Sequence, residues 1–204
     1  MSLFYKFQYL VGLTPWERMP SLPVGAQVVA LLDRVERGRE PPYGRALDLG
    51  CGSGIWSVRL AQRGWDVTGL DNVPKALRTA RERARAAGVQ ARFVEGSVTA
   101  LGAAGIGPGV RLFLDFGLGH GLTPEQLRAL SHEVSSVATG DATILMYAFS
   151  PGRRGPLPRG IDRDEIERAY EGWTIAEEEA FDVREAPRFV QKARPSFYRL
   201  RRRG

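Results

Sequence analysis

The chain has 204 residues with 29 Lys and Arg against 23 Asp and Glu, a formal net charge of +6, and a single cysteine beside two histidines. This length fits one domain with its own packed core. One cysteine excludes an internal disulfide and a thiolate zinc module, so we expect no metal and a reducing, cytoplasmic location. Five arginines and no acid lie in residues 194–204. The basic charge is therefore mainly a property of the tail, which makes a nucleic-acid partner a weaker expectation.

Residues 1–40 are predicted to form a helical lid segment over a pocket, ahead of a single domain at 41–204. The first thirteen residues lack the continuous apolar core and cleavage site of a signal peptide, and no run approaches the ~18 apolar residues that a membrane span needs. Trp16 follows Pro15 in a predicted loop. Its ring is a candidate to face a cationic group in the pocket, with simple core packing as the alternative.

Strands and helices alternate along the chain from residue 45. The expected strands are 46–49, 66–70, 91–95, 110–115 and 142–149, the last after a turn at Gly140-Asp141, and the expected helices are 55–63, 74–87, one that begins after Thr123, and 162–170. Residues 173–183 and 197–200 have the composition of a β-hairpin. Such alternation predicts an α/β fold with a largely parallel sheet, whose ligands bind at the carboxyl ends of the strands.

The most informative segment is Asp48-Leu49-Gly50-Cys51-Gly52-Ser53-Gly54, which follows the first strand. Its glycines allow a sharp turn and a close approach of the backbone to a ligand, and the helix after it offers free N–H groups. Cys51 is expected to contribute its backbone rather than a nucleophile. Asp71 ends the second strand, where a carboxylate can accept hydrogen bonds from two ribose hydroxyls. Together these residues predict a nucleoside cofactor.

Two classes of nucleoside compete for this loop. A dinucleotide site requires G-x-G-x-x-G, and its third glycine would fall at Ile55. Asp48 would also repel a pyrophosphate, whereas it suits an ammonium group. The order D-x-G-x-G-x-G resembles motif I of the class I S-adenosylmethionine (SAM)-dependent methyltransferases, of the small bacterial type. This resemblance implies a three-layer αβα sandwich with a seven-stranded, mostly parallel, Rossmann-like sheet and an antiparallel C-terminal hairpin.

The same resemblance implies which residues bind SAM and its product S-adenosylhomocysteine (SAH). The glycine loop meets the methionyl and ribose parts, and the acid of the second strand holds the ribose. Ser97 stands where the family has an acid for the adenine amino group, with the Val98 backbone as a substitute contact. The backbone at Asp115 and Phe116 borders the methionine end. The full expected set is Asp48, Gly50, Cys51, Gly52, Gly54, Asp71, Asn72, Ser97, Val98, Asp115, Phe116 and Trp16.

The acceptor is predicted from the residues that come after the fourth and fifth strands. Residues 115–118 lack the Asp/Asn-Pro-Pro-aromatic motif of base-modifying enzymes, and residues 146–149 lack the Asp-Asn pair of catechol-type metal sites. A metal-independent small-molecule acceptor remains, with a hydroxyl as the favoured group. His120 is then either a general base or a residue that orders its glycine-rich loop. Residues 151–160 and the N-terminal segment are the expected lids, and Arg153, Arg154 and Arg159 suggest an anionic acceptor or a solvated loop.

Three other functions stay open at this point: an NAD-type oxidoreductase, a methyltransferase directed at RNA, and a SAM-binding module without activity. The expected assembly is a monomer or a homodimer. The sequence leaves open whether oxygen, nitrogen or sulfur accepts the methyl group.

Overall fold

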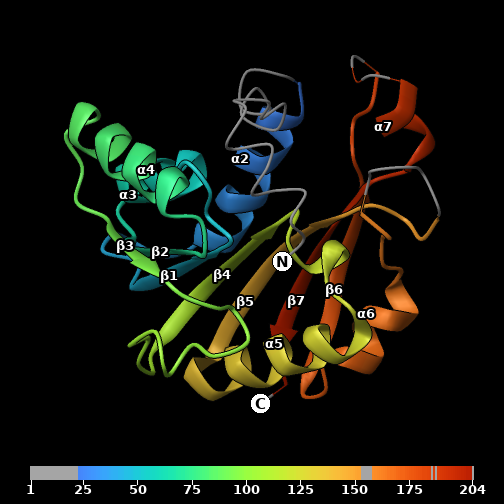
Figure 1. The fold of residues 1–204 in the computed structure, drawn as a ribbon. Coiled ribbons are helices and arrows are strands. Elements are labelled where there is room, and N and C mark those ends of the chain that lie inside the picture. Colours follow the sequence, from blue (N-terminus) through green and yellow to red (C-terminus); the bar gives the residue numbers. More distant parts are fainter. Residues whose placement is uncertain (1–22, 153–157, 185, 187, 204) are drawn as a thin grey trace.

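The computed structural model describes residues 23–152, 158–184, 186 and 188–203. Its described residues form a seven-stranded sheet in the order β3-β2-β1-β4-β5-β7-β6 (Figure 1). Strands β1 to β5 are parallel, and β7 runs antiparallel between β5 and β6. The predicted sheet and its C-terminal hairpin are confirmed. The strands are β1 Arg45–Leu49, β2 Asp66–Asp71, β3 Arg92–Glu95, β4 Val110–Phe116, β5 Ala138–Ala148, β6 Trp173–Ala180 and β7 Ser196–Arg202.

Helices cover both faces of the sheet, as the predicted three-layer sandwich requires (Figure 1). One face packs on α2 (Pro23–Glu36), α3 (Ile55–Arg63) and α4 (Pro74–Ala86), and the other on α5 (Pro124–Val137) and α6 (Arg163–Ala169). The alternation along β4 divides the two cores: Leu112 and Leu114 face α2 and α3, while Phe113 faces α5 and α6. Two short elements were not predicted, the 3₁₀ helix η2 (Gly119–Gly121) and α7 (Arg188–Lys192).

Side chains cap the N-termini of α5 and α6. The Thr123 Oγ1 accepts a hydrogen bond from Gln126 N at 3.3 Å, and the Gln126 side chain accepts from Thr123 N at 3.1 Å. Asp162 caps α6 by accepting from Glu165 N at 2.9 Å. Because α5 follows β4 and η2, its capped N-terminus lies at the carboxyl edge of the sheet, where ligands bind.

The expected turn at Gly140-Asp141 is wrong, because β5 runs through these residues. The pairing of β4 with β5 shifts register there, from Val110↔Ala138 to Leu112↔Thr143. The residues between Ala138 and Thr143 form a bulge in β5. Gly140 and Asp141, a pair that often indicates a turn, therefore lie within the strand.

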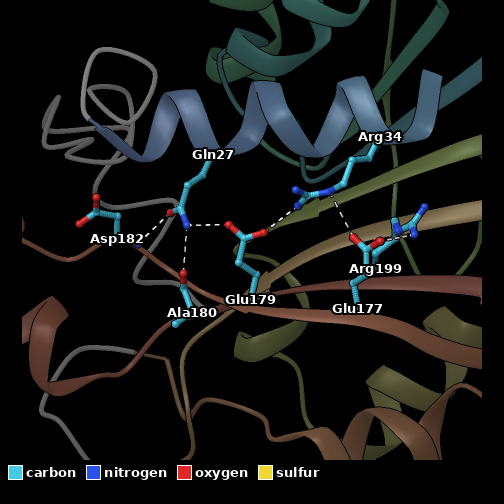
Figure 2. A network of polar contacts seen from close by, with 7 residues as sticks. All are labelled: Gln27, Arg34, Glu177, Glu179, Ala180, Asp182 and Arg199. Atoms are coloured by element: carbon cyan, nitrogen blue, oxygen red, sulfur yellow. Dashed lines mark hydrogen bonds and ion pairs between the residues drawn. The ribbon is translucent and has the colours of Figure 1, made fainter. Parts of the chain in front are cut away.

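Hydrogen bonds and an ion pair link α2 to the edge strand β6 and to the residues directly after it (Figure 2). The Gln27 amide nitrogen donates to Glu179 Oε1 at 2.9 Å and to the Ala180 carbonyl at 3.0 Å, and the Gln27 oxygen accepts from Asp182 N at 2.7 Å. Arg34, two turns later on α2, pairs with Glu179 at 2.7 Å. Within the predicted lid segment of residues 1–40, α2 is thus a helix packed on the sheet and bonded to it, while residues 1–22, including Trp16, lie outside the described part of the chain.

The arginines of the C-terminal tail belong to the sheet rather than to a free extension. Arg199 on β7 is 8% exposed and bonds to Glu177 (Figure 2). Arg202 lies over the Trp173 ring at 5.9 Å, and Arg203 donates to Thr174 Oγ1 at 3.0 Å. Intramolecular contacts thus account for several of these charges. Across the described residues, no helix is both long and apolar enough to span a membrane.

Candidate functional site

The glycine loop between β1 and α3 has the backbone that its sequence indicates. Gly50, Gly52 and Gly54 have φ angles of 68°, 53° and 74°, in the left-handed region that favours glycine. Gly50 N donates to the Leu70 carbonyl at 2.8 Å, which ties the loop to the end of β2. A Cβ at Gly54 would lie 2.8 Å from the Ala80 Cβ, so the start of α3 packs closely on α4. The loop is therefore fixed beside the carboxyl ends of β1 and β2.

Asp71 organises the same loop from the end of β2. Its Oδ2 accepts from Gly52 N at 2.9 Å, and its Oδ1 accepts from Val73 N at 2.9 Å. The residue is 4% exposed, and burial raises the pKa of its carboxyl. Each oxygen keeps a lone pair for a further donor. Asp71 can therefore hold the loop and accept hydrogen bonds from a ligand at the same time.

A pocket lies between this loop and the start of α5. The structure brings together five of the predicted residues there, since Gly50, Asp71, Asn72, Ser97 and Val98 all line it. Sequence analysis did not assign the other lining residues, which are Gly96, Thr99, Leu118, Leu122 and Gln126. The capping box before α5 was the available signal for the last two, because it places a helix start at the ligand edge.

Two polar side chains in this pocket, Asn72 and Ser97, differ in whether their oxygen is already engaged in a hydrogen bond. Asn72 Oδ1 is buried and has no hydrogen-bond partner among the described residues. A buried acceptor of this kind suits a ligand donor such as an amino or hydroxyl group. Ser97 Oγ lies 2.8 Å from Thr99 Oγ1 and accepts from Thr99 N at 3.2 Å. Its hydroxyl is shared with this turn, so Asn72 is the better-placed acceptor of the two.

Three buried carboxylates, Asp48, Asp71 and Asp115, interact at this end of the sheet. Asp48 is 3% exposed, and its Oδ2 accepts from Ser57 Oγ at 2.6 Å. Burial, with a contribution from the negative charges of the other two carboxylates, raises the pKa of Asp48 to about 7. Such a cluster favours a positively charged ligand group and disfavours a pyrophosphate. The charge at this end of the sheet is thus better suited to a cationic cofactor such as SAM than to a dinucleotide.

The Asp115 side chain orders the loop after β4. Its carboxylate accepts from Leu118 N at 3.0 Å and from Gly119 N at 2.9 Å, and burial raises its pKa to about 6. Only its backbone remains for the expected contact with the methionine end of the cofactor. The Phe116 ring packs edge-on against Trp56, with ring centroids 5.3 Å apart. Both residues shape the carboxyl end of β4 without lining the pocket.

Burial shifts the pKa of both Cys51 and His120. Cys51 is buried, and burial raises the pKa of its thiol, as expected for a residue that is not a nucleophile. His120 is 2% exposed, and its Nδ1 accepts a hydrogen bond from Phe149 N at 3.0 Å. Burial lowers the pKa of His120 to about 3. This geometry argues against a role as general base, because the lone pair that would take a proton is already engaged.

The loop after β5 is described only at its ends. Arg159 bonds to both oxygens of Glu165, at 2.8 and 2.6 Å, and to the Leu122 carbonyl. Its charge is therefore matched within the chain, while Arg153 and Arg154 lie outside the described residues. Within the described ranges, no group of three or more His, Cys, Asp or Glu residues is placed to hold a metal ion.

The sheet, the glycine loop and the strand-end acid define an α/β protein of the nucleoside-cofactor-binding class. Residues 46–139 match the family model described as a methyltransferase domain. The match covers a little under half of the chain and identifies this part as a methyltransferase domain, in agreement with the resemblance to the class I SAM-dependent methyltransferases.

Curated relatives match over short segments. The ubiquinone biosynthesis O-methyltransferase of Xanthomonas axonopodis pv. citri is 36% identical over 84 residues, which are 41% of this chain and 35% of that protein. Ribosomal RNA small subunit methyltransferase C of Alcanivorax borkumensis is 38% identical over 68 residues, 33% of this chain and 21% of that protein. The matched segments span about a third or less of the first curated relatives.

Solved structures match over nearly the whole chain and show the fold. The N-methyltransferase NodS from Bradyrhizobium japonicum, solved with SAH, has a TM-score of 0.73 at 16% identity, covering 92% of this chain and 91% of its own. The 1,6-didemethyltoxoflavin-N1-methyltransferase of Burkholderia thailandensis, solved with bound 1,6-didemethyltoxoflavin and SAH, has a TM-score of 0.71 at 20% identity, covering 99% of this chain and 88% of its own.

Proposed function

We propose that the protein is a SAM-dependent methyltransferase that methylates a hydroxyl of a small-molecule acceptor by in-line displacement. The observation that carries the proposal is the pocket at Gly50, Asp71 and Asn72 beside the buried carboxylates of Asp48 and Asp115. It combines a ribose acceptor with a negative environment, which a cationic nucleoside satisfies. Family membership of residues 46–139 supports the same assignment.

Each part of the site has a distinct task in holding the cofactor. Asp71 accepts from the ribose hydroxyls, and Asp48 balances the charge of the ammonium group. Asn72, Ser97 and Val98 surround the adenine. When bound, SAM supplies an activated methyl group, so the protein needs mainly to align the acceptor and exclude water. Trp16 remains a proposed aromatic contact.

The choice of acceptor is supported by relatives rather than by a bound ligand. Several curated relatives are named for O-methylation in ubiquinone biosynthesis, which favours a small molecule with a hydroxyl. An RNA acceptor has one relative in its favour, but the tail arginines Arg199 and Arg202 are engaged within the fold. We also propose a cytoplasmic location and a monomer or homodimer.

Calorimetric titration with SAH and with NAD tests the cofactor assignment. We expect SAH to bind and NAD not to bind. Asp71→Ala should weaken SAH by about 100-fold or more, since two hydrogen bonds to a charged group are each worth about 1.5–3 kcal/mol. Asp66→Ala, at the exposed opposite end of the same strand, is the matched control and should bind like the wild type. Wild-type affinity in a folded Asp71→Ala protein would refute the ribose contact.

Methyl transfer is tested separately with hydroxyl, amine and thiol acceptors. Product formed only with hydroxyl compounds supports O-methylation, and product with amines or thiols alone contradicts it. SAH binding with no product from any acceptor favours the SAM-binding module. Salt-sensitive RNA binding with methylated RNA would favour the RNA-directed alternative.

A further inference from the structure

Ser53 lies in the glycine loop between two glycines whose backbone is left-handed. The φ angles of Gly52 and Gly54 are 53° and 74°. Glycine adopts many backbone conformations at little steric cost, so contacts from outside the loop must select the orientation of Ser53. The helix after the loop does not do so, because Gly54 is the N-cap of α3 and it is the Gly54 carbonyl that accepts from Val58 N, at 2.9 Å.

Arg83, in the last turn of α4, makes this contact with Ser53. Its Nη1 donates to the Ser53 carbonyl and also to Ser53 Oγ, the latter at 2.6 Å. Ser53 is 3% exposed, and a polar group buried to this extent needs a partner within the protein. Hydrogen bonds from a charged donor are stronger than those between neutral groups. One guanidinium group therefore holds both the backbone and the side chain of Ser53.

The preceding residues of the loop are held by the end of β2. Gly50 N and Cys51 N donate to the Leu70 carbonyl at 2.8 and 3.0 Å. Gly52 N donates to Asp71 Oδ2 at 2.9 Å. Gly50 and Asp71 also line the pocket. The loop thus has two anchors, with β2 holding its beginning beside the pocket and α4 holding its far end.

The helix that carries Arg83 contacts the site at both of its ends. At its start, Val73 N donates to Asp71 Oδ1 at 2.9 Å. Further along α4, a Cβ at Gly54 would lie 2.8 Å from the Ala80 Cβ, so the helix and the loop are in close contact there. Ala80 and Arg83 are three residues apart and lie on the same face of the helix. Because α4 is bonded both to Asp71 and to the loop, it sets the position of one relative to the other.

We propose that Arg83 is a positioning residue for cofactor binding, which keeps the glycine loop in its binding orientation by holding Ser53. This inference rests on the proposed methyltransferase function and adds to it a residue that lies outside the pocket. Arg83 acts through Ser53 and does not touch the cofactor. Without it the loop populates several orientations, and the apparent affinity for the cofactor falls in proportion to the fraction that is competent to bind.

Calorimetric titration with SAH tests this role in variants of the full chain. Arg83→Met keeps an apolar stem of similar length and removes the donors, and it should bind SAH about tenfold more weakly than the wild type. Arg83→Lys keeps the charge and a donor group, so it should recover part of the affinity and bind only about threefold more weakly. Arg81→Met is the matched control, because Arg81 lies on the same helix and donates to the Phe93 carbonyl at 2.9 Å. It should bind SAH within about twofold of the wild type.

A second measurement tests whether Arg83 acts through Ser53. Ser53→Ala removes the Oγ acceptor and leaves the carbonyl, so alone it should weaken SAH binding by about threefold. In the Arg83→Met background the same change should cause no further loss, because the contact is already absent. All titrations are made where denaturant unfolding shows the variants to be fully folded. A merely structural role would lower the stability of Arg83→Met and leave the affinity of its folded form unchanged.

Two results would overturn the proposal: wild-type affinity for SAH in folded Arg83→Met, or an equal loss of affinity in Arg83→Met and Arg81→Met. If Arg83→Met does not fold, Arg83→Lys and Ser53→Ala decide the question, and wild-type affinity in both would overturn it. A wild-type protein that does not bind SAH would instead refute the proposed function. The two failures are therefore distinguishable.

Discussion

Asp48 carries a carboxyl whose charge should control cofactor affinity near neutral pH. Burial, together with the charges of Asp71 and Asp115, raises its pKa to about 7, while Ser57 Oγ donates to it at 2.6 Å and opposes the rise. If the ammonium group of SAH is attracted only by the ionised form, protonation of Asp48 competes with binding. The affinity for SAH should then fall as the pH falls through 7.

The size of this effect follows from the pKa. With a midpoint of about 7, the ionised fraction falls from about one half at pH 7 to about one tenth at pH 6, so SAH should bind roughly fivefold more weakly at pH 6. The amino group of the ligand stays protonated over this interval, since amino groups of this kind titrate near 8. Calorimetry in buffers of different ionisation enthalpy should also report proton release on binding.

Two variants separate the contribution of Asp48 to the pH dependence of SAH binding from those of Asp71 and Asp115. Asp48→Asn should bind SAH weakly and lose most of the pH dependence, leaving only what Asp71 and Asp115 contribute. Ser57→Ala removes the hydrogen bond that stabilises the charge, so its midpoint should move to higher pH. A wild-type affinity that is constant between pH 6 and 7, or an unaltered profile in Asp48→Asn, would refute this reasoning.

Ionisation of Asp48 should strengthen SAH binding but lower the stability of the fold. A group whose folded pKa is raised above 3.8 destabilises the folded chain where it is ionised, so stability should be lower above pH 7 than below it. A rise to about 7 corresponds to at most on the order of 4 kcal/mol. Asp48→Asn should therefore unfold at a higher temperature than the wild type at pH 8 while binding less SAH. This combination is typical of a functional group kept at a cost in stability.

Two further predictions concern the loop after β4 and the docking of α2. Gly119→Ala places a Cβ 2.5 Å from Asp115 Oδ2, so we expect it to lower the free energy of unfolding by about 1–3 kcal/mol in denaturant titrations and to slow methyl transfer. Gly107→Ala is the control, because a Cβ there would have no atom within 4 Å, and it should behave like the wild type. Gln27→Ala removes three hydrogen bonds between α2 and the β6 side and should cost about 1–3 kcal/mol in unfolding free energy with SAH affinity unchanged. Arg37→Ala, at an exposed residue of the turn directly after α2, is the control and should cost less than about 0.5 kcal/mol. Weakened SAH binding in Gln27→Ala would show instead that α2 supports the cofactor site.

The cofactor half of the site could be predicted because its signals are local. The glycine spacing at 50, 52 and 54 and the acid at Asp71 belong to one βαβ unit, where the strand order is fixed by short connections. The structure accordingly brings five of the residues expected to bind the cofactor together in one pocket, namely Gly50, Asp71, Asn72, Ser97 and Val98. Leu118, Leu122 and Gln126 were missed because their position depends on how η2 and α5 fold back over the sheet edge.

The hydrogen bonding of His120 could not be predicted from the local sequence. Its position on the ligand side was predicted, but its tautomer depends on the backbone N–H of Phe149, 29 residues further along the chain. The same holds for the tail: its composition predicts a β-hairpin strand, but the pairing of β7 between β5 and β6, which places Arg199 against Glu177, depends on distant segments. Composition and spacing contain neither of these long-range contacts.

The charges around the candidate site favour a cation over an anion. Three buried carboxylates, Asp48, Asp71 and Asp115, lie at the carboxyl ends of β1, β2 and β4, and the pKa of Asp48 is raised to about 7. His120, on η2 after β4, is neutral because burial lowers its pKa to about 3, and the charge of Arg159 is matched by Glu165. Because burial excludes water, such carboxylates attract a positively charged group more strongly than surface carboxylates do. A cofactor with ammonium and sulfonium groups therefore suits this end of the sheet better than one with a pyrophosphate, whose charge the same carboxylates repel.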